Sequence, residues 1–293
     1  MPEAPRSTSG RDWLGRLSPA INIAVVLALL SAVYLLPPDT SLSQIERSGI
    51  LRACVPNAYP PLVTGNAEAP GLEIELLQEL ADELGVRLVL NTNSTMGRDF
   101  NPRNWRLTRA QCQIIAGGVL ATPTTRSYID TTPPHLEIGW AIIDPNGDKK
   151  SLNGANVGFF AGFSGFDRIA LSQYLRGAGA EISIVASREA FAQGLSNGSF
   201  AFGITESLAA RQIAGENGWT VQWLSDSLGR IPVAFGLWKG DLTLLRRIVS
   251  ILDEMTTDGT YARLLAKYEL DQPIEGVFDG GPQAAAPEGP RSR

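Results

Sequence analysis

The side chains best suited to covalent or metal chemistry are scarce in this sequence of 293 residues. It has one histidine, His135, and two cysteines, Cys54 and Cys112. A zinc site needs about four His, Cys or carboxylate ligands, and structural zinc sites are built mainly from Cys and His. We therefore expect no metal site and no cofactor. What remains for the two cysteines is a disulfide or two small buried thiols.

The N-terminus bears on that choice, because disulfides persist only outside the reducing cytoplasm. The run from Leu17 to Pro38 carries no charge. Its length reaches the roughly 20 residues that a membrane-crossing helix needs. Three arginines precede the run and two acidic residues follow it, so the positive side stays in the cytoplasm. We expect a cytoplasmic N-terminus over 1–18 and a transmembrane anchor or signal over 19–38. The anchor is favoured over a cleaved signal, because no small-x-small cleavage site follows.

Both cysteines lie in apolar runs typical of buried strands. Cys54 belongs to the run Ile50–Val55, and Cys112 opens the run 112–116. If these strands are neighbours, a disulfide is geometrically possible, and it would be worth about 4 kcal/mol in the chain-entropy model. Two buried free thiols remain the alternative.

The rest of the sequence alternates between strand-like and helix-like segments. The strand 50–55 is followed by an amphipathic helix from Gly71 and a strand over 86–90, which is a parallel crossover unit. Further strands are predicted over 113–117, 136–143, 156–160, 181–185, 199–204 and 231–237. Further helices are predicted over 164–175, 188–195, 206–213, 242–257 and 259–268.

This order predicts an α/β protein of two lobes with crossings near 140–145 and 228–236. Lobe 1 is expected over 42–143 and 234–270, and lobe 2 over 144–233. The Pro-, Gly- and Ala-rich stretch 271–293 has no periodicity, and we expect a disordered tail there. The net charge of -5 and the lack of a basic run argue against a nucleic-acid partner.

Several short stretches, in order over residues 42–270, resemble bacterial extracellular solute-binding proteins of family 3. This family includes the periplasmic amino-acid-binding proteins of ABC transporters. The matching stretches are Gly49–Arg52 with Tyr59–Pro61, Gly71–Leu76, Ile114–Gly118 with Thr122, Pro123 and Arg126, Ser151–Gly154 with Val157, and Asp258–Tyr261 with Lys267. The resemblance implies a two-lobed periplasmic-binding-protein-like (type II) fold that closes on a ligand by hinge motion.

The resemblance also implies roles for particular residues in the cleft. Arg126 matches the arginine that grips a ligand carboxylate, although one extra residue precedes it; a surface pair with Asp130 is the alternative. Glu206 matches the acid that accepts an ammonium, although a helix start favours an acid in any case. Tyr59 matches an aromatic residue that covers the ligand.

Backbone and hydroxyl groups complete the expected ligand site. Gly117 and Gly118 would let a ligand approach the backbone, and Phe163 and Ser164 would lie at a helix start whose N–H groups bind an anion. Leu120 departs from the family pattern, which has a Ser or Thr there. We expect Thr122 to supply the missing hydroxyl, or the ligand not to be a standard α-amino acid.

The leading interpretation is an extracytoplasmic solute-binding protein, not an enzyme, that captures an amino acid or a related compound for transport or sensing. Its expected partners are a small ligand, an ABC permease or membrane complex, and the membrane itself. The first alternative is a membrane-tethered sensor or accessory protein without tight ligand binding. The second is an enzyme similar to cyclohexadienyl dehydratase, with Glu206 or His135 as acid or base. A lytic transglycosylase is excluded on the ground that no lytic domain follows residue 270.

Overall fold

The computed structural model describes residues 21–31, 38–96, 101–147, 151–162 and 165–281. Residues 1–39 and 40–293 form separate units. In the first unit, residues 21–31 are helical and their side chains are exposed. No helix in these ranges combines the length and apolarity required to cross a bilayer. Residues 19–20 and 32–37 of the predicted segment 19–38 lie outside the described residues.

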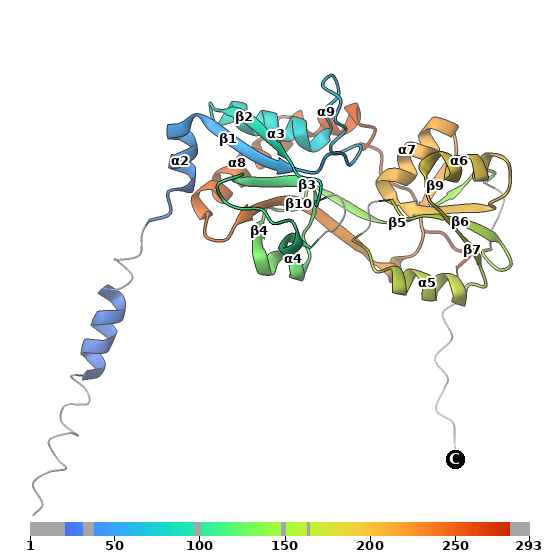
Figure 1. Cartoon of the computed structure of the whole chain (residues 1–293), viewed down its shortest axis with the longest axis horizontal. Helices are drawn as coiled ribbons and strands as arrows, with labels where there is room; N and C mark the ends of the chain where they lie inside the picture. Colours follow the sequence, from blue (N-terminus) through green and yellow to red (C-terminus); the bar gives the residue numbers. More distant parts are fainter. Residues whose placement is uncertain (1–20, 32–37, 97–100, 148–150, 163–164, 282–293) are drawn as a thin grey trace, which may run out of the picture. The chain divides into compact units, whose positions relative to one another are not determined.

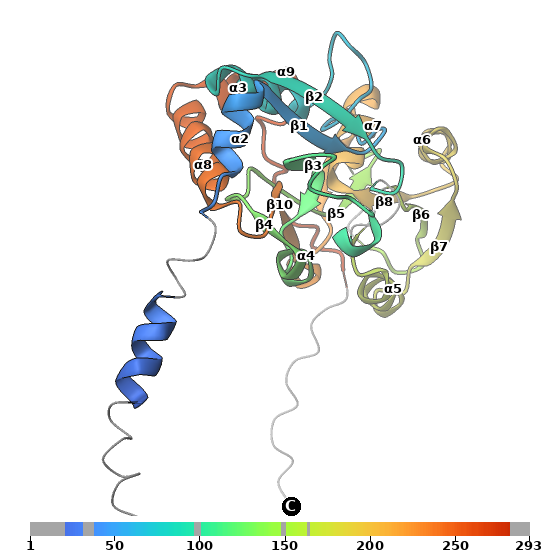
Figure 2. The same cartoon turned by 60° about the vertical axis from the view of Figure 1, so that its left-hand side comes forward.

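Residues from Thr40 onward fold into two α/β lobes joined by two long strands (Figures 1 and 2). The described helices are α2 (Ser41–Ser48), α3 (Leu72–Glu83), α4 (Pro123–Tyr128), α5 (Arg168–Gly177), α6 (Arg188–Ser196), α7 (Ser207–Asn217), α8 (Leu242–Thr257) and α9 (Thr260–Lys267). The strands are β1 (Ile50–Val55), β2 (Arg87–Thr92), β3 (Ile114–Leu120), β4 (Ile129–Thr131), β5 (Leu136–Asp144), β6 (Asn156–Phe160), β7 (Glu181–Val185), β8 (Phe202–Glu206), β9 (Thr220–Trp223) and β10 (Arg230–Trp238).

The strand order β2-β1-β3-β10-β5-β8-β6-β7 runs through both lobes. In the first lobe, β1 pairs in parallel with β2 and with β3, while β10 is antiparallel to β3. In the second lobe, β6 pairs in parallel with β7 and β8. The predicted two-lobed α/β architecture is confirmed.

The crossings are β5 and β10, of nine residues each. Residues 136–139 of β5 pair with 230–233 of β10, whereas residues 140–144 pair with β8 and β9. One end of β5 therefore belongs to the first lobe and the other end to the second. Two adjacent extended strands are the only sheet link between the lobes within the described residues, which suits a hinge.

Each lobe has its own apolar core. In the first lobe, side chains from α3, α8 and α9 pack on the central strands around Leu77, Phe235 and Ile251. The second lobe has two clusters, one around Phe202 and Val157 and one around Phe191 and Ile213.

A smaller cluster in the first lobe surrounds a disulfide between Cys54 and Cys112. The Cα atoms of the two residues are 5.6 Å apart, because β1 and β3 are neighbouring parallel strands. The disulfide alternative is confirmed, and neither cysteine is a free thiol.

The bounds of several predicted elements shift by a few residues, as for the strand predicted over 199–204 and observed as Phe202–Glu206. Two larger differences concern a helix start and the C-terminal segment. The helix predicted from Ser164 begins at Arg168, because the Asp167 carboxylate caps it by accepting from the N–H groups of Ile169 and Ala170.

The second difference concerns the predicted disordered tail. Residues 271–281 pack on the second lobe, where Ile274 and Phe278 are buried and Val277 forms a bridge with Trp223. Residues 282–293 lie outside the described residues.

Candidate functional site

The two lobes meet at a cavity of about 520 Å³, a size in the range of small-molecule sites. Tyr59 and Pro60 line it from the first lobe. The second lobe contributes Phe160, Ala161, Gly162, Val185, Ala186, Arg188, Glu206, Ala209 and Gln212. Phe160, Val185 and Glu206 are the last residues of β6, β7 and β8. Ligands of α/β sheets bind beyond the carboxyl ends of the strands, and this cavity lies there.

Glu206 is the buried acid of this cavity, with 1% of its surface exposed. Its carboxylate accepts hydrogen bonds from the Ser207 hydroxyl at 2.9 Å and from the N–H groups of Leu208 at 2.7 Å and Ala209 at 3.3 Å. It thereby caps α7. Burial raises the pKa of Glu206 to about 7, against the opposing effect of these donors. A cation placed beside this carboxylate would favour its charged form.

Tyr59 joins the first lobe to this acid. Its side chain is buried, and its hydroxyl interacts by hydrogen bonding with the Glu206 carboxylate. Burial raises the pKa of Tyr59 well above its usual value, and the carboxylates of Glu206 and Glu73 add to the effect. The phenol stays protonated at neutral pH, so it donates to the acid.

Gly117 and Gly118 lie close to the side chains of Pro56 and Tyr59, respectively, and neither glycine lines the cavity. Both have positive φ, 94° and 83°. A Cβ atom on Gly117 would lie 2.0 Å from Pro56, and one on Gly118 would lie 2.4 Å from the Tyr59 ring. Protein side chains therefore fill the space in the Cβ direction of both glycines.

A second buried acid, Glu73 on α3, binds the backbone of these glycines. Its carboxylate accepts from the N–H of Gly117 and, at 3.2 Å, from the N–H of Gly118. The same carboxylate lies 3.0 Å from Nε2 of His135, which is also buried. Nδ1 of His135 has no hydrogen-bond partner among the described residues, and its ring packs on Phe235. His135 does not line the cavity of Tyr59 and Glu206. It lines a separate hollow, of about 450 Å³, whose walls include Arg211 and Trp223 of the second lobe.

The other predicted site residues lie elsewhere. Arg126 is exposed in the last turn of α4, where its Nε donates to Thr131 at 3.2 Å, and it does not line the cavity. The Thr122 hydroxyl caps α4 by accepting from the N–H of Thr125. Phe163 and Ser164 lie outside the described residues. The structure therefore brings Tyr59 and Glu206 together at the cavity. The other described candidates do not line it: Gly117, Gly118, Arg126 and Thr122.

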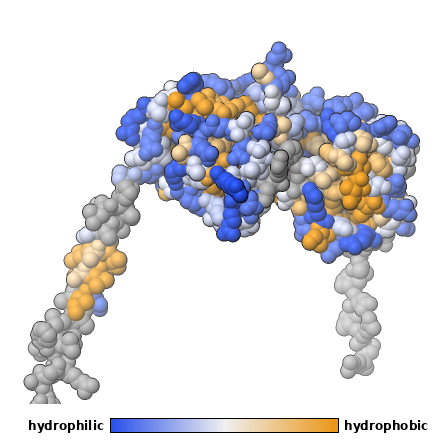
Figure 3. All heavy atoms as spheres, viewed as in Figure 1, coloured by the Kyte–Doolittle hydropathy of each residue, from blue (hydrophilic) through white to orange (hydrophobic). Residues whose placement is uncertain are grey.

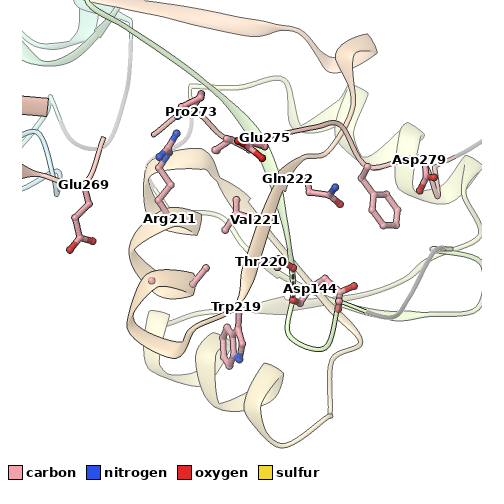
Figure 4. Close-up of a pocket in the computed structure, with 15 residues that line it drawn as sticks. Asp144, Arg211, Trp219, Thr220, Val221, Gln222, Glu269, Pro273, Glu275 and Asp279 are labelled. Carbon is pink, nitrogen blue, oxygen red and sulfur yellow. Dashed lines mark hydrogen bonds between the residues drawn. The ribbon is translucent and has the colours of Figure 1, made fainter. Parts of the chain in front are cut away.

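A larger hollow of about 710 Å³ lies on the second lobe, between α7, β9 and the segment 269–279 (Figure 4). Figure 4 shows Arg211 and Trp219 on its wall, with Glu275 and Asp279 from the C-terminal segment. No predicted ligand residue lines this hollow. Among the described residues there is no group of three or more His, Cys, Asp and Glu side chains arranged to hold a metal ion.

Comparison with known proteins places this geometry in context. A family model described as "Bacterial extracellular solute-binding proteins, family 3" matches residues 51–271. The solved structure of an ancestral cationic amino acid solute-binding protein covers 78% of this chain and 99% of its own, with 24% identity and a TM-score of 0.65. The substrate-binding protein of an ABC uptake transporter from Streptococcus pneumoniae, solved with bound histidine, has 16% identity, a TM-score of 0.59 and coverage of 80% and 98%. At these identities the likeness shows the fold, and it confirms the predicted periplasmic-binding-protein fold.

Curated relatives share a different name, membrane-bound lytic murein transglycosylase F. The Pseudomonas putida protein is 25% identical over 84% of this chain and 51% of its own length. The Vibrio vulnificus protein is 28% identical over 45% of this chain and 24% of its own. The chain spans about half the length, or less, of the curated relatives that it matches.

These relatives overturn the expectation that the chain is not an enzyme, because their name is that of an enzyme. The exclusion of a lytic transglycosylase relied on where the sequence ends, and the end of a sequence carries no information about activity. That expectation is withdrawn.

Proposed function

Since the chain belongs to the bacterial extracellular solute-binding proteins of family 3, we propose that it captures a small polar ligand, an amino acid or a related compound, between its lobes. The observation that carries the proposal is the cavity in which Tyr59 of the first lobe meets the buried Glu206 of the second. A ligand ammonium would take the place beside Glu206, and the rings of Tyr59 and Phe160 would cover its carbon chain.

Closure about β5 and β10 would then enclose the ligand. The cavity is lined from both lobes, so a ligand there gains contacts with both only when the lobes come together. We place the lobes outside the cytoplasm, tethered through the segment 19–38. Both delivery to an ABC permease and reporting of the bound ligand to a membrane complex fit such a clamp.

The curated relatives favour a second candidate role. We propose that the two lobes form the ligand-responsive part of a murein-directed lytic system, because about half of the Pseudomonas putida enzyme aligns with 84% of this chain. Clearing of a murein suspension by the full chain, alone and with membrane extract, tests this role. This role is refuted if the suspension does not clear under either condition and added ligands do not change the rate of clearing.

A thermal-shift screen of the full chain against amino acids, amines and organic acids tests the binding proposal. A ligand at 100 times its dissociation constant stabilises by about 2.7 kcal/mol, which raises the melting temperature by several degrees. The Glu206→Ala variant should lose the shift, and Arg126→Ala should keep it. Absence of a shift with every compound contradicts the proposal.

A further inference from the structure

Carboxylates of the protein itself occupy several pairs of backbone N–H groups that could otherwise bind an anion. In the first lobe, the N–H groups of Gly117 and Gly118 both point at Glu73, which is fully buried. Two adjacent N–H groups of this kind form a ready anion site. Here the Glu73 side chain already accepts from both N–H groups.

The second lobe repeats this arrangement at two helix starts. The N–H groups of Ile169 and Ala170, at the start of α5, donate to Asp167 at 2.9 Å each. Those of Leu208 and Ala209, at the start of α7, donate to Glu206. A helix N-terminus attracts an anion through such free N–H groups, and both helices use them on their own side chains.

The candidate cationic side chains are also engaged with other residues of the protein. Arg126 is exposed and donates to Thr131. Of the described residues that line the cavity, only Arg188 is cationic, and it pairs with Glu216 at 2.8 Å on the surface. Leu120, where the family pattern has a hydroxyl, is 2% exposed and packs in the core of the first lobe.

The cavity does offer what an ammonium requires. Glu206 supplies a buried carboxylate, the rings of Tyr59 and Phe160 supply π faces, and Val185 and Ala161 supply apolar wall. The Gln212 amide adds a neutral polar group. The lining therefore suits an alkylamine. Its one cationic side chain among the described residues, Arg188, is already paired with Glu216.

We propose that the cavity recognises its ligand through an ammonium group alone and selects amines that lack an α-carboxylate. The ligand class is that of alkyl diamines and guanidino-alkylamines rather than α-amino acids. This inference rests on the proposed ligand-binding function. When the α-ammonium of an amino acid lies beside Glu206, its α-carboxylate is also close to this acid, and like charges at short range are unfavourable.

Titration calorimetry of the full chain with matched pairs tests the inference. Cadaverine is lysine without its α-carboxylate, and agmatine stands in the same relation to arginine. We expect each amine to bind at least about tenfold more tightly than its amino acid. Equal binding, or tighter binding of the amino acids, overturns the inference while leaving the binding function intact. If none of the four compounds binds and the screen described above also finds no ligand, the binding function itself fails.

Proton release gives an independent readout at Glu206. Because the free protein has a Glu206 pKa of about 7, binding of a cation at pH 7 should release about half a proton. Titrations in buffers of different ionisation enthalpy measure this release. Glu206→Gln should abolish it and weaken amine binding, whereas Arg126→Ala should change neither. Loss of amine binding in Arg126→Ala would overturn the inference, because it would place an arginine grip in the site.

Discussion

Replacing Glu206 with glutamine should change how the stability of the protein depends on pH. Burial raises the pKa of Glu206 from 4.5 to about 7 in the folded state. The unfolded chain, whose Glu206 carboxyl has an ordinary pKa, therefore loses its proton at lower pH than the folded protein. Between about pH 4.5 and 7 the folded state binds more protons, so this residue lowers the free energy of unfolding as the pH rises. This rise in the pKa of Glu206, from 4.5 to about 7, corresponds to about 3 kcal/mol.

The measurement is urea unfolding of the wild type and Glu206→Gln between pH 4 and 8. Glutamine keeps an amide oxygen that can accept from the N–H of Leu208, so the cap on α7 is retained. The unfolding free energy of the variant minus that of the wild type should rise by about 3 kcal/mol across this window. All other titrating groups are common to both proteins and cancel.

Glu75 provides the matched control. Burial raises its pKa, but hydrogen bonds from Lys267 and Tyr268 outweigh that effect and the net pKa is lowered. Its stabilising contribution is present above the unfolded pKa and is lost as the pH falls through the folded pKa. The Glu75→Gln difference should therefore be flat from about pH 5 to 8. A Glu206→Gln difference that is also flat would refute the account of a buried, half-protonated acid.

Three further predictions concern the first lobe. The double variant Cys54→Ser, Cys112→Ser removes a disulfide of sequence separation 58 and should lower the free energy of unfolding in urea by about 4 kcal/mol. The account fails if the variant is as stable as the unreduced wild type. Glu73→Ala leaves the N–H groups of Gly117 and Gly118 without their acceptor and should lower the free energy of unfolding by about 3 kcal/mol or more. Glu73→Gln should lower it less. Equal stability of the wild type and both variants would contradict the assigned hydrogen bonds. Gly118→Ala forces a Cβ against the Tyr59 ring. Gly49 also has a positive φ, but a Cβ added there meets no atom within 4 Å, so Gly118→Ala should lower the free energy of unfolding by about 1–3 kcal/mol more than Gly49→Ala. Equal effects of the two substitutions would rule out this close contact.

The sequence predicts most strands and helices because their periodicity is strong. The strand 156–160 has the predicted bounds, since the apolar run is closed on both sides by small and polar residues. The start of α5 was misplaced because Ser164 and Asp167 are both good N-caps, and local propensity does not choose between them. The segment 271–281 was misread since Ile274 and Phe278 are isolated apolar residues among Pro and Gly, and only contact with the second lobe orders them.

The site was predictable in part. Tyr59 and Glu206 follow from the resemblance to the family, and both line the cavity. Phe160 and Val185 were missed, although they end predicted strands, and the rule for the carboxyl ends of parallel strands could have selected them. Glu73 could not be found from pattern alone, because an acid in the first turn of a helix is ordinarily a solvated partner of the helix dipole.

Apolar surface on the second lobe is visible in Figure 3, and the exposed large apolar residues there include Ile169, Ile182 and Ile184. Ile182 and Ile184 lie on β7, which is the last strand of the sheet order. Unpaired edge strands promote association between chains. Binding and unfolding experiments should therefore be run at low protein concentration.

The central claim is that the two lobes close on a small amine-bearing ligand, and the distance between them tests it most directly. Both native cysteines are in the disulfide, so spin labels at Glu68→Cys and Gln193→Cys, two exposed positions on different lobes, report this distance alone. The account predicts that saturating cadaverine shifts and narrows the distance distribution in the wild-type background but not in Glu206→Ala, and that lysine does so only at higher concentration. A distribution unchanged by both compounds would contradict the claim.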